Sequence, residues 1–510
     1  MKRLVMYVMM IAGTLVVSAV IASCSKDDST EQTLPPDDTD TPVNPDEKET
    51  VSGDYSQSYR PQIHFSPAKN WINDPNGMVY YNGVWHLFYQ YNPYGNDWGN
   101  MSWGHATSTD LVHWTEQAVA ITKSSIGDIF SGSCVIDADN TAGFGKDAMI
   151  AVYTGNGDKQ QQGLAYSVDA GKTFVQYAAN PVIANSTMSD FRDPKVFWHE
   201  KSRKWVMALA RGYEYKIDFY GSEDLKNWTY LSSYSSAVER THKGQWECPD
   251  LFPLSFGGEE KWVLLVSINP GGPVQGSGTM YFVGDFDGET FTADNLEYPL
   301  WVDYGMDNYA GVTWSNAGNR RILLGWMNNW LYAGSVPCSP WRSAMTLPRE
   351  LSLVNNNGTP LLASTVVGEV EALAGEWTDV VAGQPFADGK AYQLQLSLST
   401  QADQTVTLSN EKGEKLVMEL NSGAKKLIVR RNAATGDVSF SGSFSLPSIQ
   451  APLNTDAKEV VLNVYIDQSS VEIFSADGTL AMTNLVFPTS IYNRCTASGS
   501  AKVRTLKSIW

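Results

Sequence analysis

The chain has 510 residues, 43% of them hydrophobic, which is long enough for two domains that each bury a core. Its net charge of −18 excludes binding to a nucleic-acid backbone, which requires clustered lysine and arginine side chains. The 17 tryptophans and 24 tyrosines are equally compatible with filling cores and with offering flat, amphipathic rings to ligands such as sugars.

The N-terminus has the pattern of a targeting segment. Lys2 and Arg3 precede an apolar run over residues 4–22, as in a secretory signal. The run is also just long enough to span a bilayer, so an uncleaved anchor is the alternative. Ile21-Ala22-Ser23-Cys24 resembles the bacterial lipoprotein box, in which the signal is cut before the cysteine and that cysteine is lipidated. We therefore expect a lipoprotein signal peptide at residues 1–23 and a lipid on Cys24.

The segment after Cys24 is acidic and poor in large apolar residues. Lys26-Asp27-Asp28 resembles the export signal that carries lipoproteins to the outer face of the outer membrane in Bacteroides-like bacteria. Residues 24–55 are dominated by Asp, Glu, Thr and Pro, which predicts a disordered tether. We expect a cell-surface outer-membrane lipoprotein, held to the membrane only by its N-terminal lipid; a periplasm-facing lipoprotein is the alternative.

Short apolar strands recur about every 60 residues through the first half of the remaining chain. The five copies are residues 84–89, 148–153, 204–209, 261–266 and 321–326. A turn closing onto an aromatic-led strand recurs in phase with the first four copies, at residues 108–114, 167–174, 222–228 and 285–291. No amphipathic helix separates the strands, so the repeats predict a five-bladed β-propeller over residues 56–350. A β-sandwich is the runner-up for this region, but its strands would not repeat at this period.

The C-terminal part predicts antiparallel sheet. Tyr392, Leu394, Leu396 and Leu398 alternate with polar residues, and residues 462–466 repeat the pattern, as in half-buried strands. We expect an all-β chain in which a linker at residues 351–372 leads to a β-sandwich at residues 373–510. This sandwich is either a carbohydrate-binding accessory or a support for the propeller, and we favour the support.

Residues 71–77, Trp-Ile-Asn-Asp-Pro-Asn-Gly, gather a carboxylate and two carboxamides in one turn. Alone, such a turn is most often structural, with its polar side chains capping their own backbone. Here Asp74 lies just before the first repeated strand, and Asp193 and Glu247 lie at the equivalent places of the third and fourth repeats. Equivalent positions of a propeller surround the mouth of its central channel. Carboxylates gathered there raise one another's pKa, which indicates an active site rather than a folding element.

Two carboxyl groups across a small pocket are the equipment of glycoside hydrolysis. Aromatic residues that suit sugar stacking lie near the predicted mouth: Trp71, Trp98, Trp103, Tyr309, Trp314 and Trp341. The four cysteines after Cys24 are far apart, the six histidines are scattered, and no Gly-rich phosphate loop occurs. We therefore expect carboxylate chemistry without a metal or an organic cofactor.

The chain resembles glycoside hydrolase family 32, the β-fructofuranosidases that include invertases, inulinases and levanases. The resemblance covers about residues 60–510. Its marks are the block at 71–77, Phe88-Tyr89-Gln90-Tyr91-Asn92-Pro93, Trp98-Gly99, Phe130-Ser131-Gly132-Ser133, Phe191-Arg192-Asp193-Pro194, Trp246-Glu247-Cys248-Pro249 and residues 341–351. It implies a five-bladed propeller followed by a β-sandwich, in agreement with the repeats.

The resemblance also implies roles for single residues. Asp74 matches the nucleophile that forms a fructosyl-enzyme ester, and Glu247 matches the acid/base catalyst, whose pKa should be raised. Asp193 matches the residue that holds two fructosyl hydroxyls and stabilises the transition state, with Arg192 beside it to bind a hydroxyl and keep Asp193 ionised. Further substrate contacts are expected from Asn73, Gln90, Trp98 and Ser131, and from the aromatic residues Tyr309, Trp314 and Trp341.

These features predict a retaining hydrolase of β-fructosidic linkages in fructans. A surface lipoprotein suits a polymer too large to import, so levan or inulin is favoured over sucrose, within a surface glycan-uptake complex. The alternatives are a surface fructan-binding protein derived from a hydrolase, a sucrose hydrolase and a fructosyltransferase. The presence of all three carboxylates favours an enzyme over the binding protein. Linkage preference, endo or exo action, and hydrolysis or transfer stay open.

Overall fold

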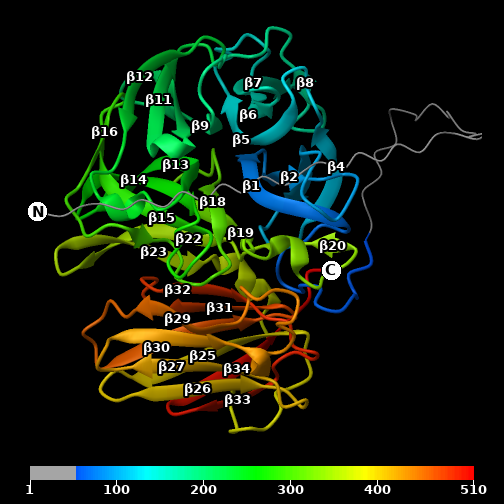
Figure 1. Cartoon of the computed structure of the whole chain (residues 1–510), viewed down its shortest axis with the longest axis vertical. Coiled ribbons are helices and arrows are strands. Elements are labelled where there is room, and N and C mark those ends of the chain that lie inside the picture. Colours follow the sequence, from blue (N-terminus) through cyan, green and yellow to red (C-terminus); the bar gives the residue numbers. More distant parts are fainter. Residues whose placement is uncertain (1–52) are drawn as a thin grey trace, which may run out of the picture. The chain divides into compact units, whose positions relative to one another are not determined.

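The computed structural model describes residues 53–510, so the predicted signal peptide, Cys24 and nearly all of the predicted tether lie outside the described residues. These residues form an all-β structure of seven sheets, and five of the sheets follow one another around a common centre (Figure 1). Among residues 53–510, no helix is long and apolar enough to cross a membrane.

The first three sheets follow the chain as three propeller blades. Blade one holds β1 (Asn70–Tyr81), β2 (Val84–Tyr91), β3 (Ser102–Ser108) and β4 (Thr115–Ile121). Blade two holds β5 (Asp128–Asp137), β6 (Ala148–Asn156), β7 (Gln160–Ser167) and β8 (Val175–Gln176). Blade three holds β9 (Arg192–His199), β10 (Lys204–Arg211), β11 (Lys216–Ser222) and β12 (Thr229–Tyr234).

Two further blades complete the propeller. Blade four holds β13 (Gln245–Phe256), β14 (Glu259–Asn269), β15 (Gly278–Phe286), β16 (Phe291–Ala293) and β17 (Leu300–Trp301). Blade five holds β18 (Tyr309–Thr313), β19 (Ile322–Met327), β21 (Ala344–Met345), β22 (Arg349–Asn356) and β23 (Thr359–Val366). The short strand β20 (Trp341–Arg342) then pairs in parallel with β1 of blade one, which closes the ring.

The two repeated motifs correspond to fixed places in the blades. The predicted apolar strands are the second strands β2, β6, β10, β14 and β19, which are almost fully buried. The second motif forms the turn into the outermost strand, where an aspartate binds the turn's backbone. In blade one, Asp110 Oδ1 accepts hydrogen bonds from the amides of Val112 and His113 at 3.0 and 2.8 Å. Asp224 does the same in blade three, so the repeat reflects turn chemistry.

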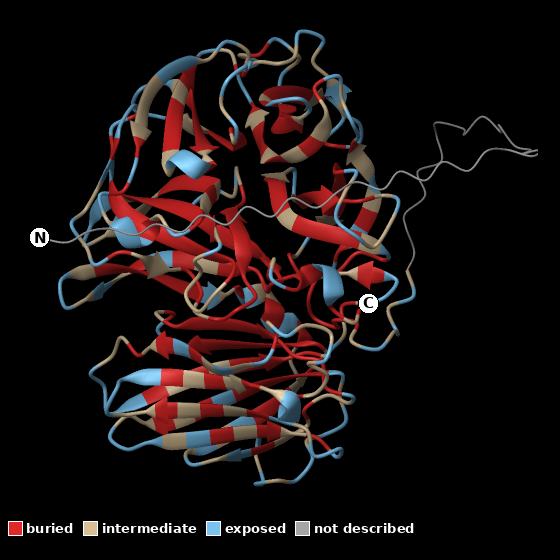
Figure 2. Ribbon diagram, in the orientation of Figure 1, coloured by how far each residue is buried: buried red, intermediate tan, exposed pale blue. Residues whose placement is uncertain are grey.

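The C-terminal part folds as the predicted β-sandwich. One sheet holds β24 (Thr378–Asp379), β25 (Ala391–Ser399), β30 (Glu459–Ile466), β31 (Ser470–Ser475), β32 (Ala481–Leu485) and β34 (Ser500–Leu506). The other holds β26 (Gln404–Ser409), β27 (Lys415–Asn421), β28 (Lys426–Arg431), β29 (Leu446–Pro452) and β33 (Arg494–Ala497). Figure 2 shows buried and exposed residues alternating along these strands, as the period of two predicted.

The described residues contain only short 3₁₀ turns as helical elements. These are η1 (Gly212–Glu214), η2 (Glu239–Thr241), η3 (Ala333–Ser335), η4 (Gly368–Leu373) and η5 (Ala433–Thr435).

The predicted linker at residues 351–372 is wrong. Most of these residues belong to β22 and β23, which form a hairpin of blade five. The two-residue turn is Asn357-Gly358, with φ angles of +51° and +86°. Asn-Gly accepts positive φ at both positions and is a strong hairpin signal. The Asn-Gly pair thus indicated a hairpin, but residues 349–366 follow the last copy of the 60-residue repeat, so the repeat did not assign them to the propeller.

The propeller and the sandwich belong to one compact unit and share a buried ionic network. Arg349 of blade five donates to Asp303, which follows blade four, at 2.8 Å and to Glu472 of the sandwich at 2.7 Å. All three side chains are buried. Thr483 of β32 also donates its hydroxyl to Asp303 at 2.7 Å. The sandwich is thus fixed to the propeller through charges that have no access to water.

We expect Arg349→Met to destabilise the protein by about 3–4 kcal/mol, because it leaves Asp303 buried without a cation and leaves Glu472 with His64 as its one remaining cationic partner, at 3.3 Å. Urea unfolding measures the change. The matched control is Arg430→Met in the sandwich, where Arg430 pairs with Glu419 at 2.6 Å on a partly exposed face. That substitution should cost less than about 1 kcal/mol. Equal effects of the two substitutions would contradict the role given to Arg349.

Candidate active site

The inner strands of all five blades carry a register irregularity near their first residues. It lies between Ile72 and Pro75 in β1, Ile129 and Gly132 in β5, Arg192 and Lys195 in β9, Glu247 and Asp250 in β13, and Tyr309 and Val312 in β18. Such a bulge turns a side chain away from the regular pleat. The five inner strands contact one another in a closed ring, so the bulges aim their side chains at one central space.

A cavity of about 490 Å³ lies at this end of the inner strands. It is lined by Asn73, Asp74, Gln90, Trp98, Phe130, Ser131, Asn156, Gln160, Asp190, Arg192, Asp193, Gln245, Glu247 and Trp330. The structure therefore brings together the three predicted carboxylates and five of the predicted substrate contacts, Asn73, Gln90, Trp98, Ser131 and Arg192. Trp98 is half-exposed, at 50%, and offers an open aromatic face to a ligand.

Asp74 is held by a chain of hydrogen bonds on both of its oxygens. Ser131 donates its hydroxyl to Asp74 Oδ2 at 2.7 Å, and Asn73 donates its side-chain amide to Oδ1 at 3.0 Å. The carbonyl oxygen of the Asn73 side chain accepts from the indole of buried Trp71 at 2.8 Å. Trp71 thereby fixes the orientation of Asn73, and Asn73 fixes Asp74.

Glu247 is held by the phenol of Tyr309 and the guanidinium of Arg192. Tyr309 donates to Glu247 Oε2, and Arg192 Nη2 donates to Oε1 at 2.9 Å. The Glu247 side chain is 19% exposed, and that part faces the cavity. Burial raises the pKa of Glu247 in spite of the opposing charge of Arg192. A carboxyl group held in this way retains a proton at a pH where an exposed glutamate has lost it.

Asp193 has positive φ, +65°, and its side chain is buried beside the other two carboxylates. The backbone amide of Cys248 donates to its Oδ2 at 2.9 Å. Burial raises the pKa of Asp193 to about 7; Arg192 opposes this rise, while Glu247 and Asp74 add to it. Arg192 Nε lies 3.8 Å from Asp193, and its Nη atoms bind Glu247 and Asp190 instead. Arg192 thus lowers the pKa of Asp193, as expected, but does not offset the effect of burial.

Asp193→Asn is expected to raise the free energy of unfolding at pH 7 by about 1–3 kcal/mol. Because the pKa of Asp193 is raised from 3.8, its stabilising contribution is complete below about pH 4 and is lost as the pH rises through 7. Asparagine imitates the protonated form at every pH and also tolerates positive φ. Urea unfolding at pH 4 and pH 7 tests this, and a gain of equal size at both values would contradict the assignment.

Three aromatic residues that were predicted to contact the substrate have buried rings. Trp314 is fully buried, donates its indole to the carbonyl of His86 at 2.9 Å and stacks on Trp114. Trp341 is 1% exposed in the closing strand β20, and the guanidinium of Arg60 lies 3.6 Å from its ring. Neither tryptophan lines the cavity, so both predictions are wrong. Tyr309 is also buried, and its contact with the site is its hydroxyl bond to Glu247.

The cavity includes residues that the sequence reasoning missed, chiefly Asp190, Gln160 and Trp330. Arg192 Nη1 donates to Asp190 and, at 3.2 Å, to Gln160 Oε1, so both residues position the guanidinium. Asp190 lies two residues before the Arg192-Asp193-Pro194 motif, where a carboxylate beside an arginine was a usable signal. Trp330 lies in the connection after β19, outside every repeat, and no sequence signal pointed to it.

The cavity is closed at its base by a buried ion pair. Lys195 of β9 donates to Asp250 of β13 at 3.1 Å and to the carbonyl of Thr313 in β18 at 2.7 Å. Thr313 also donates its amide and its hydroxyl to Asp250, at 2.6 and 2.8 Å. These bonds join three inner strands across the channel. The active-site cavity therefore does not continue to the other end of the channel.

The arrangement can perform proton transfer and nucleophilic attack at one point. It combines a carboxylate whose two oxygens are oriented, a carboxyl group that retains its proton, and an arginine. Residues 53–510 contain no group of His, Cys, Asp and Glu side chains arranged to hold a metal ion. The described cysteines, Cys134, Cys248, Cys338 and Cys495, are buried free thiols.

Comparison with known proteins gives consistent matches. Residues 64–364 match the N-terminal domain, and residues 364–509 the C-terminal domain, of the glycosyl hydrolases of family 32. A levanase of Bacillus subtilis is 43% identical, over 89% of this chain and 72% of that protein. An extracellular exo-inulinase of Aspergillus niger is 39% identical, over 89% of this chain and 96% of that protein. The crystal structure of exo-inulinase from Aspergillus awamori superposes with a TM-score of 0.83 at 36% identity, covering 90% of this chain and 100% of the other.

Proposed function

The chain belongs to the glycosyl hydrolases of family 32, and from this we propose that it hydrolyses β-fructosidic linkages of levan or inulin with retention of configuration. The observation that carries the proposal is the convergence of Asp74, Asp193 and Glu247 on one pocket, where they accept hydrogen bonds from the Ser131 hydroxyl, the Cys248 amide and the Tyr309 hydroxyl respectively.

In the first step, Asp74 attacks the anomeric carbon of a terminal fructosyl unit and forms an ester, while Glu247 gives its proton to the departing oxygen. Ser131 and Asn73 hold the attacking carboxylate in one orientation. Burial keeps Glu247 protonated beforehand. In the second step, Glu247 takes a proton from water while the water oxygen attacks the anomeric carbon; the ester bond to Asp74 breaks, fructose is released and the carboxylate is restored.

Asp193 accepts hydrogen bonds from two fructosyl hydroxyls and stabilises the positive charge that develops on the ring. Burial raises the pKa of Asp193. Sugar hydroxyls that donate hydrogen bonds to ionised Asp193 stabilise its charge. Bound substrate thus adds to the stabilisation of the ionised form, which Arg192 alone does not complete. Gln90 and Trp98 complete the subsite for the terminal unit, with Trp330 as a further aromatic wall.

The pocket supports attack on chain ends. Lys195, Asp250 and Thr313 close its base, so a chain cannot pass through the channel, and an end unit can fill the cavity without the chain continuing beyond it. The similarity to a levanase and to exo-inulinases supports a fructan substrate. It leaves β-2,6 and β-2,1 linkages as two outcomes of the test.

A product time course with protein that lacks residues 1–24 tests the function. Levan, inulin and sucrose are supplied separately. Free fructose as the only early product from a polymer is the expected result, and the polymer consumed fastest identifies the linkage. An early ladder of oligosaccharides would overturn exo action. Sucrose as the only substrate would identify a sucrose hydrolase, longer products would identify a transferase, and no product would support a fructan-binding protein.

We also propose a cell-surface location, which rests on the sequence around Cys24. A lipid on this cysteine would attach the enzyme to the outer membrane, beside a glycan-uptake complex that takes in the released sugar. Labelling with radioactive palmitate, with and without Cys24→Ala, tests the lipid. Protease treatment of intact cells distinguishes a surface location from a periplasmic one.

A further inference from the structure

A second cavity, of about 430 Å³, lies at the opposite end of the inner strands. Strands β9 and β13 line both cavities: Asp193 and Glu247 face the active site, and Lys195 and Leu251, further along the same strands, face the second cavity. The pair of Lys195 and Asp250 separates them. The second cavity is therefore independent of the proposed chemistry.

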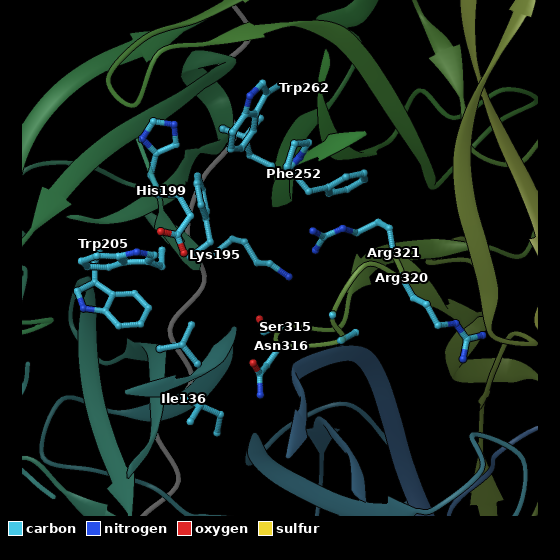
Figure 3. A pocket seen from close by; sticks show the side chains of 18 of the residues that line it. Ile136, Lys195, His199, Trp205, Phe252, Trp262, Ser315, Asn316, Arg320 and Arg321 are labelled. Carbon is cyan, nitrogen blue, oxygen red and sulfur yellow. The ribbon is translucent and has the colours of Figure 1, made fainter. Parts of the chain in front are cut away.

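Several walls of the second cavity carry aromatic rings (Figure 3). They are formed by Phe197, Trp198, Trp205, Phe252 and Trp262. Flat rings on several sides suit a ligand with a flat body, such as another ring.

Two cations face each other inside this cavity. Figure 3 shows Lys195 and Arg321 extending toward one another, whereas the guanidinium of Arg320 points away. Arg320 is paired with Glu350 and Glu369. Among the described residues, Arg321 has a contact with the ring of Phe252, 4.9 Å from its centroid, and its buried Nε has no hydrogen-bond partner.

Asp250 is the carboxylate whose negative charge acts on both Lys195 and Arg321. Asp250 Oδ2 accepts from Lys195 and from Thr313, and the buried Oδ1 of Asp250 has no hydrogen-bond partner. Burial lowers the pKa of Arg321, and the charge of Asp250 offsets this only in part. Of the two glutamates on the lining, Glu200 is exposed and Glu260 is paired with Lys201 at 2.8 Å. The interior thus carries one excess positive charge in a chain whose net charge is −18.

We propose that this cavity binds a small monocarboxylate that carries a ring. The carboxylate lies between Lys195 and Arg321, and the ring lies against the aromatic walls. One negative charge completes the pairing, and the fork of a guanidinium suits the two oxygens of a carboxylate. A neutral sugar would leave Arg321 buried without an acceptor, which is costly. The body of the ligand is either aromatic or a sugar acid, since both share this chemistry.

Titration of the full chain with phenylacetate, followed by tryptophan fluorescence and calorimetry, tests the proposal. We expect saturable binding, with the neutral isostere phenylacetamide weaker by about 10-fold or more, because a hydrogen bond to a charged partner is lost. Glucuronate is titrated in parallel. The tighter of the two acids identifies the ligand body, and failure of both to bind would overturn the proposal.

Two variants locate the binding. Arg321→Met, which keeps a long apolar stem against Phe252, should weaken binding about 10- to 100-fold. Arg320→Met, the neighbouring arginine with its own carboxylate partners, should change affinity less than about 2-fold. Saturating fructose should not displace the acid, since fructose is expected in the other cavity. Thermal unfolding by circular dichroism checks the fold, and Arg321→Lys, with a smaller expected loss, replaces Arg321→Met if that variant does not fold. Unchanged affinity in the Arg321 variant, or displacement by fructose, would overturn the assignment.

Discussion

Glu247→Gln is expected to lower kcat on fructans about 10³-fold, the usual scale of general acid–base catalysis. The substitution removes the proton that must reach the departing oxygen, while the side chain keeps its size and its contact with Tyr309. The affinity for fructan should therefore remain within a few-fold of the parent protein. Steady-state hydrolysis gives kcat, and calorimetry on the inactive variant gives the dissociation constant.

A substrate whose leaving group needs no proton separates this role from a structural one. Fructosyl fluoride should restore the first step in Glu247→Gln, whereas the second step stays slow because no base activates water. The expected signature is a burst of fluoride equal to the enzyme concentration, followed by slow turnover. Fructan hydrolysis at the parent rate would remove Glu247 from the acid/base role.

Asp74→Asn should be the more severe change, with a loss of roughly 10⁵-fold in kcat, since removal of a nucleophile stops the reaction at its first bond. The carboxamide accepts the hydrogen bond from Ser131 but forms no ester. Fructosyl fluoride should not rescue this variant and should give no burst, in contrast to Glu247→Gln. The two results together show which step of the reaction needs each carboxylate.

The ester itself can be located. Glu247→Gln treated with fructosyl fluoride should gain the mass of one fructosyl group, carried by the peptide that contains Asp74. Asp97→Asn is a matched control, because Asp97 is an exposed aspartate paired with Arg342, outside the cavity lining. It should keep parent activity. A fructosyl label on any other residue would contradict the assignment of Asp74.

The sequence predicted the propeller and the gathering of Asp74, Asp193 and Glu247 for one reason. A propeller repeats its geometry, so residues in phase along the chain meet at the channel. The five register irregularities occur at these in-phase positions. Residues outside the repeat, such as Asp190 and Trp330, are positioned by loops whose course depends on packing, so sequence phase carries no information about them.

The errors at Trp314 and Trp341 have a different origin. Nearness to a motif does not determine which way a side chain points, and a strand sends successive residues to opposite faces. Trp341 lies in β20, the strand that closes the circle of blades, and its indole ring packs against the buried guanidinium of Arg60. Closure is a contact between the two ends of the propeller, and it cannot be read from a local pattern.

The closed base of the active-site pocket affects the order in which the substrate binds and the products leave. Substrate and both products enter and leave at the same end of the channel. The shortened chain must therefore leave before water reaches the fructosyl ester, and fructose leaves last. Free fructose and fresh chain ends consequently compete for the vacant pocket, and hydrolysis slows as fructose accumulates. A sugar hydroxyl in the same space would compete with water for the fructosyl unit, so we expect any transfer to increase with the concentration of sugar.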